Sequence, residues 1–310
     1  MKLLLLSFMP AVIVAASVWI DTDPSVQRGA HEVDDGFALL QAFHSPELRI
    51  RGVSIVFGNA PLATALPIGQ EIVRRFGPVG LAVYSGAAGS RDLGTETDAS
   101  RAIAKTLKSE RLTILALGPA TNVATVLRNH PELARQIDRI IAVAGRRPGQ
   151  HFLTGRATRP FRDFNFEMDP QAFQVILDSK VPLVLTPWEI SSKVWLTRED
   201  LELLLKSNPA TEWLTTPASD WLDFWKKSFD VDGFNPFDTL AVGYAIKSKN
   251  FRCESLPAKI DTLPDDTDSA RNKPYLLVAK DIDSAFQVNY CSEAPPGFKQ
   301  DLISRLTSKW

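Results

Sequence analysis

The chain has 310 residues, of which 45% are hydrophobic and 23% charged, and its formal net charge is −1. A chain of this length can bury a full hydrophobic core. The balance of 35 basic against 36 acidic residues argues against a nucleic-acid polymer or an anionic membrane surface as a partner. Four histidines and two cysteines cannot build a zinc site of Cys and His spacing. Cys253 and Cys291 could pair or remain free.

Residues 1–17 have the pattern of a secretory signal. Lys2 is followed by an apolar stretch and by the small residues Ala15, Ala16 and Ser17. The stretch is too short for a comfortable membrane span. We therefore expect a signal peptide over 1–17, a secreted or periplasmic protein without stable membrane association after processing, and one domain over 18–310. The alternative is a cytoplasmic protein that retains this segment as a core strand.

An acidic turn follows the first predicted strand, which ends at Val18–Ile20. Asp21, Asp23, Asp34 and Asp35 lie within 15 residues of sequence, and Asp35 begins an apolar helix over 35–43. Helix capping explains one or two such acids but not four. Carboxylates are hard oxygen donors suited to calcium or magnesium, so the pattern favours a metal or catalytic site.

The rest of the chain alternates apolar strands with helices. This alternation predicts a single α/β domain with a mostly parallel open sheet flanked by helices, and ligands bind such sheets beyond the carboxyl ends of the strands. A helical region over 189–236 carries four tryptophans, a solvated loop is expected at 263–274, and two last strands at 275–279 and 285–291. The earlier predicted strands cover 50–57, 81–84, 112–117, 139–144 and 181–185.

Five short motifs, each of low specificity alone, occur along the chain in an order and spacing that together are specific. With them the chain resembles the inosine/uridine-preferring nucleoside hydrolase family from about Val18 to its end. The motifs are Asp21-x-Asp23-Pro24, Asp34-Asp35, Phe57-Gly58-Asn59, Leu117-Gly118-Pro119-Ala120-Thr121-Asn122, and Asp163-Phe164-Asn165 with Asp169-Pro170.

The sequence departs from the family pattern at four places. Residues 25–32 enlarge the loop before the Asp-Asp pair, and Phe237-Asp238 stands where the family often has His-Asp. Ala157 occupies the position of an expected asparagine, and Asp163 that of a usual glutamate.

The resemblance implies a nucleoside N-ribohydrolase that releases ribose and free base. It implies Ca²⁺ bound by Asp23, both oxygens of Asp35, Asp238 and the backbone carbonyl of Thr121, with Asp34 as general base on the metal-bound water. It also implies that Asn59, Asp163 and Asn165 hold the ribose. This chemistry is coherent, because glycosidic cleavage passes through an oxocarbenium-like state that nearby anions stabilise and an activated water attacks.

Several of these residues have simpler interpretations. Trp221 and Trp225 lie four residues apart, so core packing and base stacking are equally open. His31, in the enlarged loop, reads as a surface histidine rather than an acid. The others would act in turns or helix starts: Asn59 as a turn residue, and Asn122, Asp169 and Asp238 as helix-capping residues.

The leaving base needs a proton or a stacking partner, and Phe237 has no proton to give. We therefore expect aromatic walls, with Trp188 and Phe237 contributing and Trp221 or Trp225 as further candidates, or His31 folding over from its loop. Stacking favours the larger purine rings, so purine nucleosides should be cleaved faster than uridine.

Two other functions are consistent with parts of the sequence. Asp21-Thr22-Asp23 also resembles the first motif of haloacid-dehalogenase-type phosphatases, with Asp21 as nucleophile and magnesium as cofactor, but the early Asp34-Asp35 pair does not fit. The other is an exported nucleoside- or sugar-binding protein without turnover, which the intact carboxylates oppose. In every nucleoside-directed interpretation the partner is a small molecule, and we expect a homo-oligomer.

Overall fold

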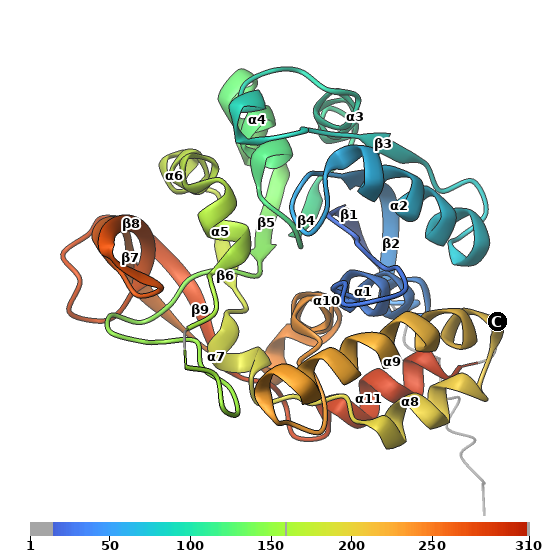
Figure 1. Cartoon of the computed structure of the whole chain (residues 1–310). Coiled ribbons are helices and arrows are strands. Elements are labelled where there is room, and N and C mark those ends of the chain that lie inside the picture. Colours follow the sequence, from blue (N-terminus) through green and yellow to red (C-terminus); the bar gives the residue numbers. More distant parts are fainter. Residues whose placement is uncertain (1–14, 159, 309–310) are drawn as a thin grey trace, which may run out of the picture.

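The fold is built on one nine-stranded sheet, seen in a computed structural model that describes residues 15–158 and 160–308 (Figure 1). The strand order is β3-β2-β1-β4-β5-β6-β9-β7-β8. Neighbours from β3 to β9 are parallel, whereas β9–β7 and β7–β8 are antiparallel. The single, mostly parallel α/β sheet is therefore confirmed. The strands are β1 (Ala16–Thr22), β2 (Leu48–Ile55), β3 (Val83–Ser85), β4 (Leu112–Ala116), β5 (Ile137–Ala142), β6 (Leu183–Leu185), β7 (Arg252–Asp265), β8 (Asp268–Val278) and β9 (Gln287–Glu293).

Helices cover both faces of the sheet, as the alternation of side chains along β1 requires. Val18 and Ile20 belong to one core with α1, α2, α10 and α11, while Trp19 belongs to the other with α3, α4 and α6. Trp19 fits only because Gly52 on β2 has no side chain, since a Cβ there would lie 2.5 Å from the indole. The helices are α1 (Asp34–Phe43), α2 (Leu62–Phe76), α3 (Asp98–Leu107), α4 (Thr121–Asn129), α5 (Phe164–Met168), α6 (Pro170–Ser179), α7 (Trp188–Ser191), α8 (Arg198–Leu205), α9 (Pro209–Phe229), α10 (Phe237–Lys247) and α11 (Phe298–Leu306).

Most predicted elements are confirmed, with ends that differ by a few residues. The helical stretch over 189–236 resolves into α7, α8 and α9. Asp169 is the N-cap of α6, where its side chain accepts a hydrogen bond from Ala172 N at 3.0 Å, as predicted for a helix start.

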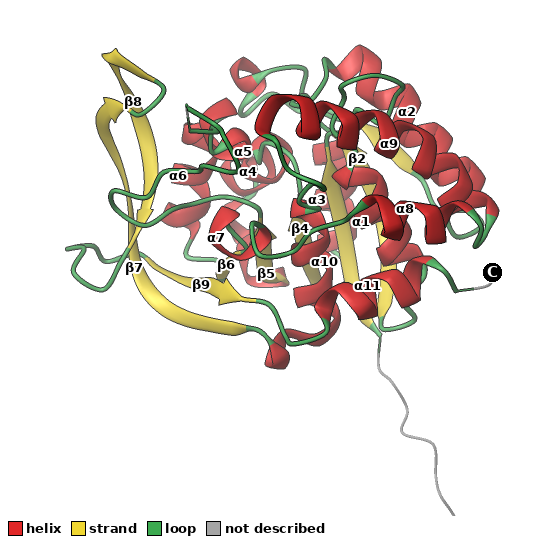
Figure 2. Ribbon diagram, turned by 60° about the horizontal axis from the view of Figure 1, so that its bottom comes forward, coloured by secondary structure: helices red, strands yellow, loops and turns green. Residues whose placement is uncertain are grey.

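The prediction of a solvated loop over 263–274 is wrong. These residues form the end of β7 and most of β8, a long hairpin that projects away from α8 and α9 (Figures 1 and 2). The many charged residues suggested a loop, but Lys273 is buried in the fold, where carboxylates surround it. Charge pairing, which composition does not show, overrides the polarity of the segment.

The two cysteines left open by the sequence form a disulfide between β7 and β9. Residues 1–14 of the expected signal peptide lie outside the described residues, and Ala16 and Ser17 belong to β1. Across the described ranges, none of the helices combines the length and apolar character needed to cross a membrane.

Candidate active site

A cavity of about 470 Å³ lies beyond the carboxyl ends of the parallel strands. Its walls come from residues that follow β1, β2, β4, β5 and β6, together with α9 and the start of α10. The volume is in the range of small-molecule sites, about 300–1,000 Å³. Acidic side chains gather at one end of the lining, and aromatic rings make up much of the rest.

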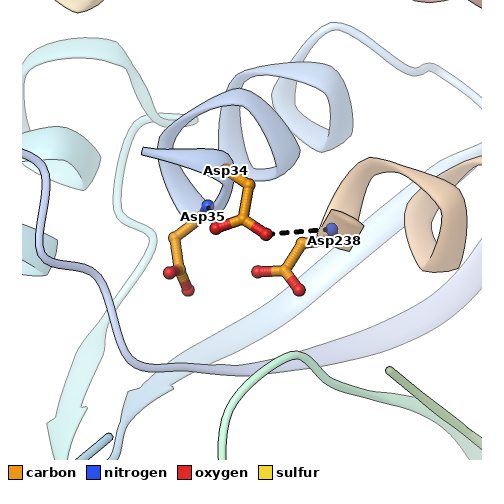
Figure 3. A group of neighbouring side chains, drawn as sticks. All are labelled: Asp34, Asp35 and Asp238. Atoms are coloured by element: carbon orange, nitrogen blue, oxygen red, sulfur yellow. Dashed lines mark hydrogen bonds between the residues drawn. The ribbon is translucent and has the colours of Figure 1, made fainter. Parts of the chain in front are cut away.

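Three carboxylates meet where two helices begin. Asp34 and Asp35 open α1, and Asp238 lies in the first turn of α10, the helix against which α1 packs (Figure 3). One oxygen from each residue lies within 4.8 Å of the other two. Asp34 Oδ2 accepts a hydrogen bond from Asp238 N at 3.3 Å, which fixes one helix start against the other. Helix N-termini favour negative charge, so this is where the fold tolerates such a group.

Asp35 is oriented by three donors, from the last residue of β1 and from the loops that follow β1 and β2. Its Oδ1 accepts hydrogen bonds from Thr22 Oγ1 and, at 3.1 Å, from Asp23 N, while Asn59 Nδ2 lies 3.4 Å from Oδ2. Asp23 therefore adjoins the cluster through its backbone.

The Asp23 side chain is held by the backbone after β2. Its Oδ2 accepts a hydrogen bond from Asn59 N at 2.7 Å, and its Oδ1 is buried without a partner in the described structure. A Cβ on Gly58 would lie 1.9 Å from Asp23 Oδ2. Gly58 is thus required by this close approach, and Asn59 is more than a turn residue.

Burial raises the pKa of every carboxyl group in the cluster, and repulsion between carboxylates adds to the rise for Asp23, Asp34 and Asp238. Desolvation, followed by repulsion from Asp35, raises the pKa of Asp34 to about 8, and desolvation raises that of Asp35 to about 6. The pKa values of Asp23 and Asp238 rise well above their usual range for the same two reasons. A divalent cation among these oxygens would keep them ionised. The unpartnered Asp23 Oδ1 and the hard donor set fit such an ion.

Asp21 and Asn122 belong to the layer beneath the site. Asp21 is fully buried, accepts hydrogen bonds from Ser54 Oγ and from Asn122 Nδ2 (2.8 Å), and is not among the described residues that line the cavity. Asn122 Oδ1 accepts from Ala87 N at 2.8 Å, so its interpretation as a helix cap is wrong. It ties the loop after β3 to the end of β1.

Thr121 is buried at the start of α4, and its Oγ1 donates to Asp169 Oδ2 at 2.6 Å. Its backbone carbonyl stays a predicted ligand. Asp169 therefore caps α6 with one carboxylate oxygen and holds the start of α4 with the other.

The three residues predicted to hold a ribose all line the cavity. They are Asn59, Asp163 and Asn165. Asn165 Nδ2 donates to Leu117 O at 2.6 Å, and Asp163 Oδ2 accepts from Gly145 N at 2.8 Å. Desolvation raises the pKa of Asp163 to about 6, with Arg146 opposing the rise.

The aromatic wall is larger than the sequence suggested. Trp188, Phe237, Trp221 and Trp225 all line the cavity, and Trp225 also packs in the core at 3% exposure, so the two interpretations of Trp225 are compatible. Sequence reasoning missed Phe152, Phe161, Phe164, Phe224 and Phe229. Phe224 could have been found from the sequence, because it lies three residues after Trp221 on α9 and therefore on the same helix face. Phe152 and Phe161 lie in a loop closed by a β-bridge between them, and no sequence pattern marks it.

The enlarged loop contributes a residue that the sequence did not single out. Glu32 lines the cavity beside Asp34, and desolvation and repulsion from Asp34 raise its pKa well above the usual range. His31 is exposed and is not among the lining residues described. The loop is fastened to α9, because Asp220 accepts hydrogen bonds from Arg28 Nε and Gly29 N. Ala157 lies in the turn between Phe152 and Phe161, where its amide bonds to Thr154 O.

Comparison with known proteins gives one consistent family. The family profile described as inosine-uridine preferring nucleoside hydrolase matches residues 18–288. The chain is 26% identical to the pyrimidine-specific ribonucleoside hydrolase RihA of Citrobacter koseri, over 90% of this chain and 98% of that protein. It is 24% identical to a probable uridine nucleosidase 2 of Oryza sativa subsp. japonica, over 79% and 78% of the two chains.

Solved structures show the same fold. A plant nucleoside hydrolase superposes with a TM-score of 0.80 at 20% identity, covering 95% of this chain and 99% of that one. The purine-preferring ribonucleoside hydrolase from Gardnerella vaginalis superposes with a TM-score of 0.77 at 18% identity, covering 94% and 98%.

Proposed function

The chain belongs to the inosine-uridine preferring nucleoside hydrolase family and hydrolyses N-glycosyl bonds, and from this premise we propose a calcium-dependent cleavage of ribonucleosides to ribose and free base. The observation that carries the proposal is that Asp34 and Asp238 of the carboxylate cluster line the same cavity as the aromatic rings and the residues predicted to hold the ribose. Carboxylates can stabilise positive charge on the sugar and accept a proton from the attacking water, and aromatic rings can stack on the base.

Asp23, Asp35, Asp238 and the Thr121 carbonyl would hold the calcium ion, which when bound supplies positive charge that orients water and lowers its pKa. The buried Oδ1 of Asp23, which has no partner in the described structure, supports its place in this set. Asp34 and Asp238 are the two cluster members that line the cavity, with Glu32 beside them, and Asp34 is the one outside the proposed ligand set.

Asp34 takes the proton of the attacking water as general base. Its two carboxylate oxygens accept hydrogen bonds from Asp35 N (3.1 Å) and Asp238 N (3.3 Å), which aim the carboxylate without neutralising it. Asn59, Asp163 and Asn165 hold the ribose. The negative charge of Asp163 stabilises the positive charge that develops on the sugar.

The base departs between aromatic walls formed by Trp188, Phe237, Trp221 and Trp225. Phe152 stacks on Trp188 with ring centroids 5.2 Å apart, which holds the indole plane in place. Wide aromatic surfaces favour purines, so purine nucleosides are the preferred substrates.

We place the mature protein outside the cytoplasm as a homo-oligomer. The signal-like residues 1–17 support export, and so does the Cys253–Cys291 disulfide, since such bonds persist in oxidising compartments. N-terminal sequencing of mature protein from its source organism tests the export: processing near Ala16 is expected, and an intact Met1 contradicts it.

The activity is tested by incubating the purified protein with a panel of nucleosides and measuring free ribose, with and without a chelator. Ribose release that stops on exhaustive chelation and returns with calcium is expected. Full activity after chelation, or stoichiometric zinc by elemental analysis, contradicts the calcium proposal. Tight nucleoside binding without ribose release indicates the non-enzymatic binding protein, and phosphate release from phosphate esters indicates the phosphatase.

A further inference from the structure

The β7–β8 hairpin contributes Asp266 and Lys273 to a buried group of charged side chains next to the cavity wall. Arg146, which follows β5, and Glu167 of α5 complete the group. Lys273 Nζ lies 2.9 Å from Glu167 Oε1 and 2.7 Å from Asp266 Oδ1. Arg146 Nη1 lies 2.7 Å from Asp266 Oδ2, and Arg146 Nη2 lies 3.6 Å from Glu167 Oε1. All four side chains are at most 10% exposed. Lys273 Nζ also lies 3.3 Å from Asp265 Oδ1, and Arg162 Nε lies 2.9 Å from Glu167 Oε2. Removing Lys273 would therefore leave three carboxylates with one counterion fewer, which is costly for those that are buried.

This charge cluster, defined as Arg146, Glu167, Asp266 and Lys273, is hydrogen-bonded to the backbone of Asp163, the acidic residue predicted to hold the ribose. Glu167 Oε1 accepts a hydrogen bond from Asp163 N at 2.9 Å. Asp163 Oδ2 accepts one from Gly145 N at 2.8 Å, and Gly145 directly precedes Arg146. Asp163 is therefore fixed through both its backbone and its side chain.

The same cluster supports the aromatic wall. The Arg146 guanidinium lies 4.0 Å from the centroid of the Phe152 ring, and Phe152 stacks on Trp188. Arg146 also joins the hairpin through its backbone, since its N donates to Leu276 O (3.0 Å) and its O accepts from Val278 N (2.9 Å). A displaced hairpin would move the ribose carboxylate and the base wall together.

We propose that Lys273 and Arg146 are positioning residues through which the β7–β8 hairpin sets the affinity of the cavity for its nucleoside. Neither is among the described lining residues, so their effect passes through Asp163 and Phe152. The identity of the ligand rests on the proposed function, whereas the connection from hairpin to cavity rests on the contacts alone.

The test compares Lys273→Met with Lys259→Met in the full-length protein. Lys259 lies on the same hairpin but pairs with Asp261 at the surface, so it is a matched control. For Lys273→Met we expect KM to rise about tenfold because the ribose contact is misplaced. We expect kcat to fall by less, because Asp163 stabilises the charge on the sugar less well while the acid cluster is intact. Amide hydrogen exchange should become faster in residues 145–167. The control should show neither change.

Asp266→Asn provides a second, milder variant if Lys273→Met does not fold. It removes the shared counterion of Arg146 and Lys273 while keeping the shape of the side chain. Unchanged exchange in residues 145–167 in a folded variant overturns the inference, and so does an unchanged KM in an active one. If the wild-type protein cleaves no nucleoside, the proposed function fails, and the hydrogen exchange alone decides the positioning role.

Discussion

The two ends of the cavity are built in different ways. At the acidic end, the backbone fixes each carboxylate: Asp34, Asp35 and Asp238 stand at helix starts, and Asp23 lies against Gly58. At the aromatic end, side chains from distant segments pack on one another, as Trp188 does on Phe152. The acidic end requires particular residues at fixed positions in the sequence. The aromatic end requires only that the packed side chains fill the space and present enough ring area. Chemistry should therefore be sensitive to single atoms at the acidic end, and substrate choice should be adjustable at the aromatic end.

Asp34→Asn should separate the two ends most clearly. The substitution keeps the shape and the metal ligands but removes the proton acceptor, so kcat should fall by about 10³-fold with the fold and calcium content retained. Steady-state kinetics with elemental analysis measures both. Asp23→Asn is the comparison variant and should lose calcium. Near-normal turnover in Asp34→Asn, with activity abolished by Asp21→Asn, would support the phosphatase interpretation instead.

Gly58→Ala should break the acidic end without adding or removing charge. A Cβ would overlap Asp23 Oδ2, so either the backbone or the carboxylate must move, at a cost of about 3 kcal/mol in the free energy of unfolding. Denaturant unfolding measures this cost. Gly89→Ala is the control, because a Cβ there meets no atom within 4 Å. Equal stability of the two variants would contradict the close packing.

The acidic end should also make stability depend on pH when calcium is absent. The folded-state pKa values of Asp34 and Asp35, about 8 and about 6, lie above the usual aspartate value of 3.8. The folded protein then binds more protons than the unfolded chain, so in chelator the free energy of unfolding should fall as pH rises from 4 through 8. A fixed calcium concentration of about 100 times the Kd at pH 8 should add about 2.7 kcal/mol to the free energy of unfolding at pH 8. The same concentration should add less at pH 5, because protons compete with calcium for the carboxylates and raise the Kd. Calorimetric Tm values that calcium raises equally at both pH values would refute this.

Trp188→Leu should act on substrate choice. Loss of the stacked indole should lower kcat/KM for inosine by about tenfold and for uridine by less, since the purine overlaps more ring area. A kinetic panel of inosine, adenosine, guanosine and uridine measures the ratio. Wild-type uridine turnover at least as fast as that of every purine nucleoside shows that the stacking argument is wrong.

His31→Ala should have the smallest effect. Because His31 is exposed and Glu32, rather than His31, lines the cavity, turnover should stay within about threefold of wild type. A loss of about a hundredfold or more in kcat would identify His31 as the leaving-group acid. The pH profile of the same variant provides the control, because a missing acid removes its alkaline limb.

The same contrast explains how much the sequence could predict. The acidic end follows from local patterns, because Asp34-Asp35 and Phe57-Gly58-Asn59 each sit at a strand or helix boundary that hydrophobic periodicity locates. Part of the aromatic wall could be predicted: Trp188 from its place shortly after a strand, and Phe237 from its place beside Asp238, while Trp221 and Trp225 stayed open. The hairpin around Lys273 depends on pairing between residues more than 100 positions apart, such as Lys273 with Glu167. Phe152 depends on stacking against Trp188 from a separate segment of the chain. No local pattern contains that information.

The disulfide between Cys253 and Cys291 encloses the hairpin in a covalent ring. The two cysteines are 38 positions apart, and the ring contains most of β7, all of β8 and the first part of β9. Closing a ring of this size restricts the unfolded chain by about 4 kcal/mol. A protease that cuts the turn at residues 266–267 would therefore produce no separate fragments. The nicked protein would migrate as one chain until a reductant is added, with the support of the cavity wall still attached to the sheet.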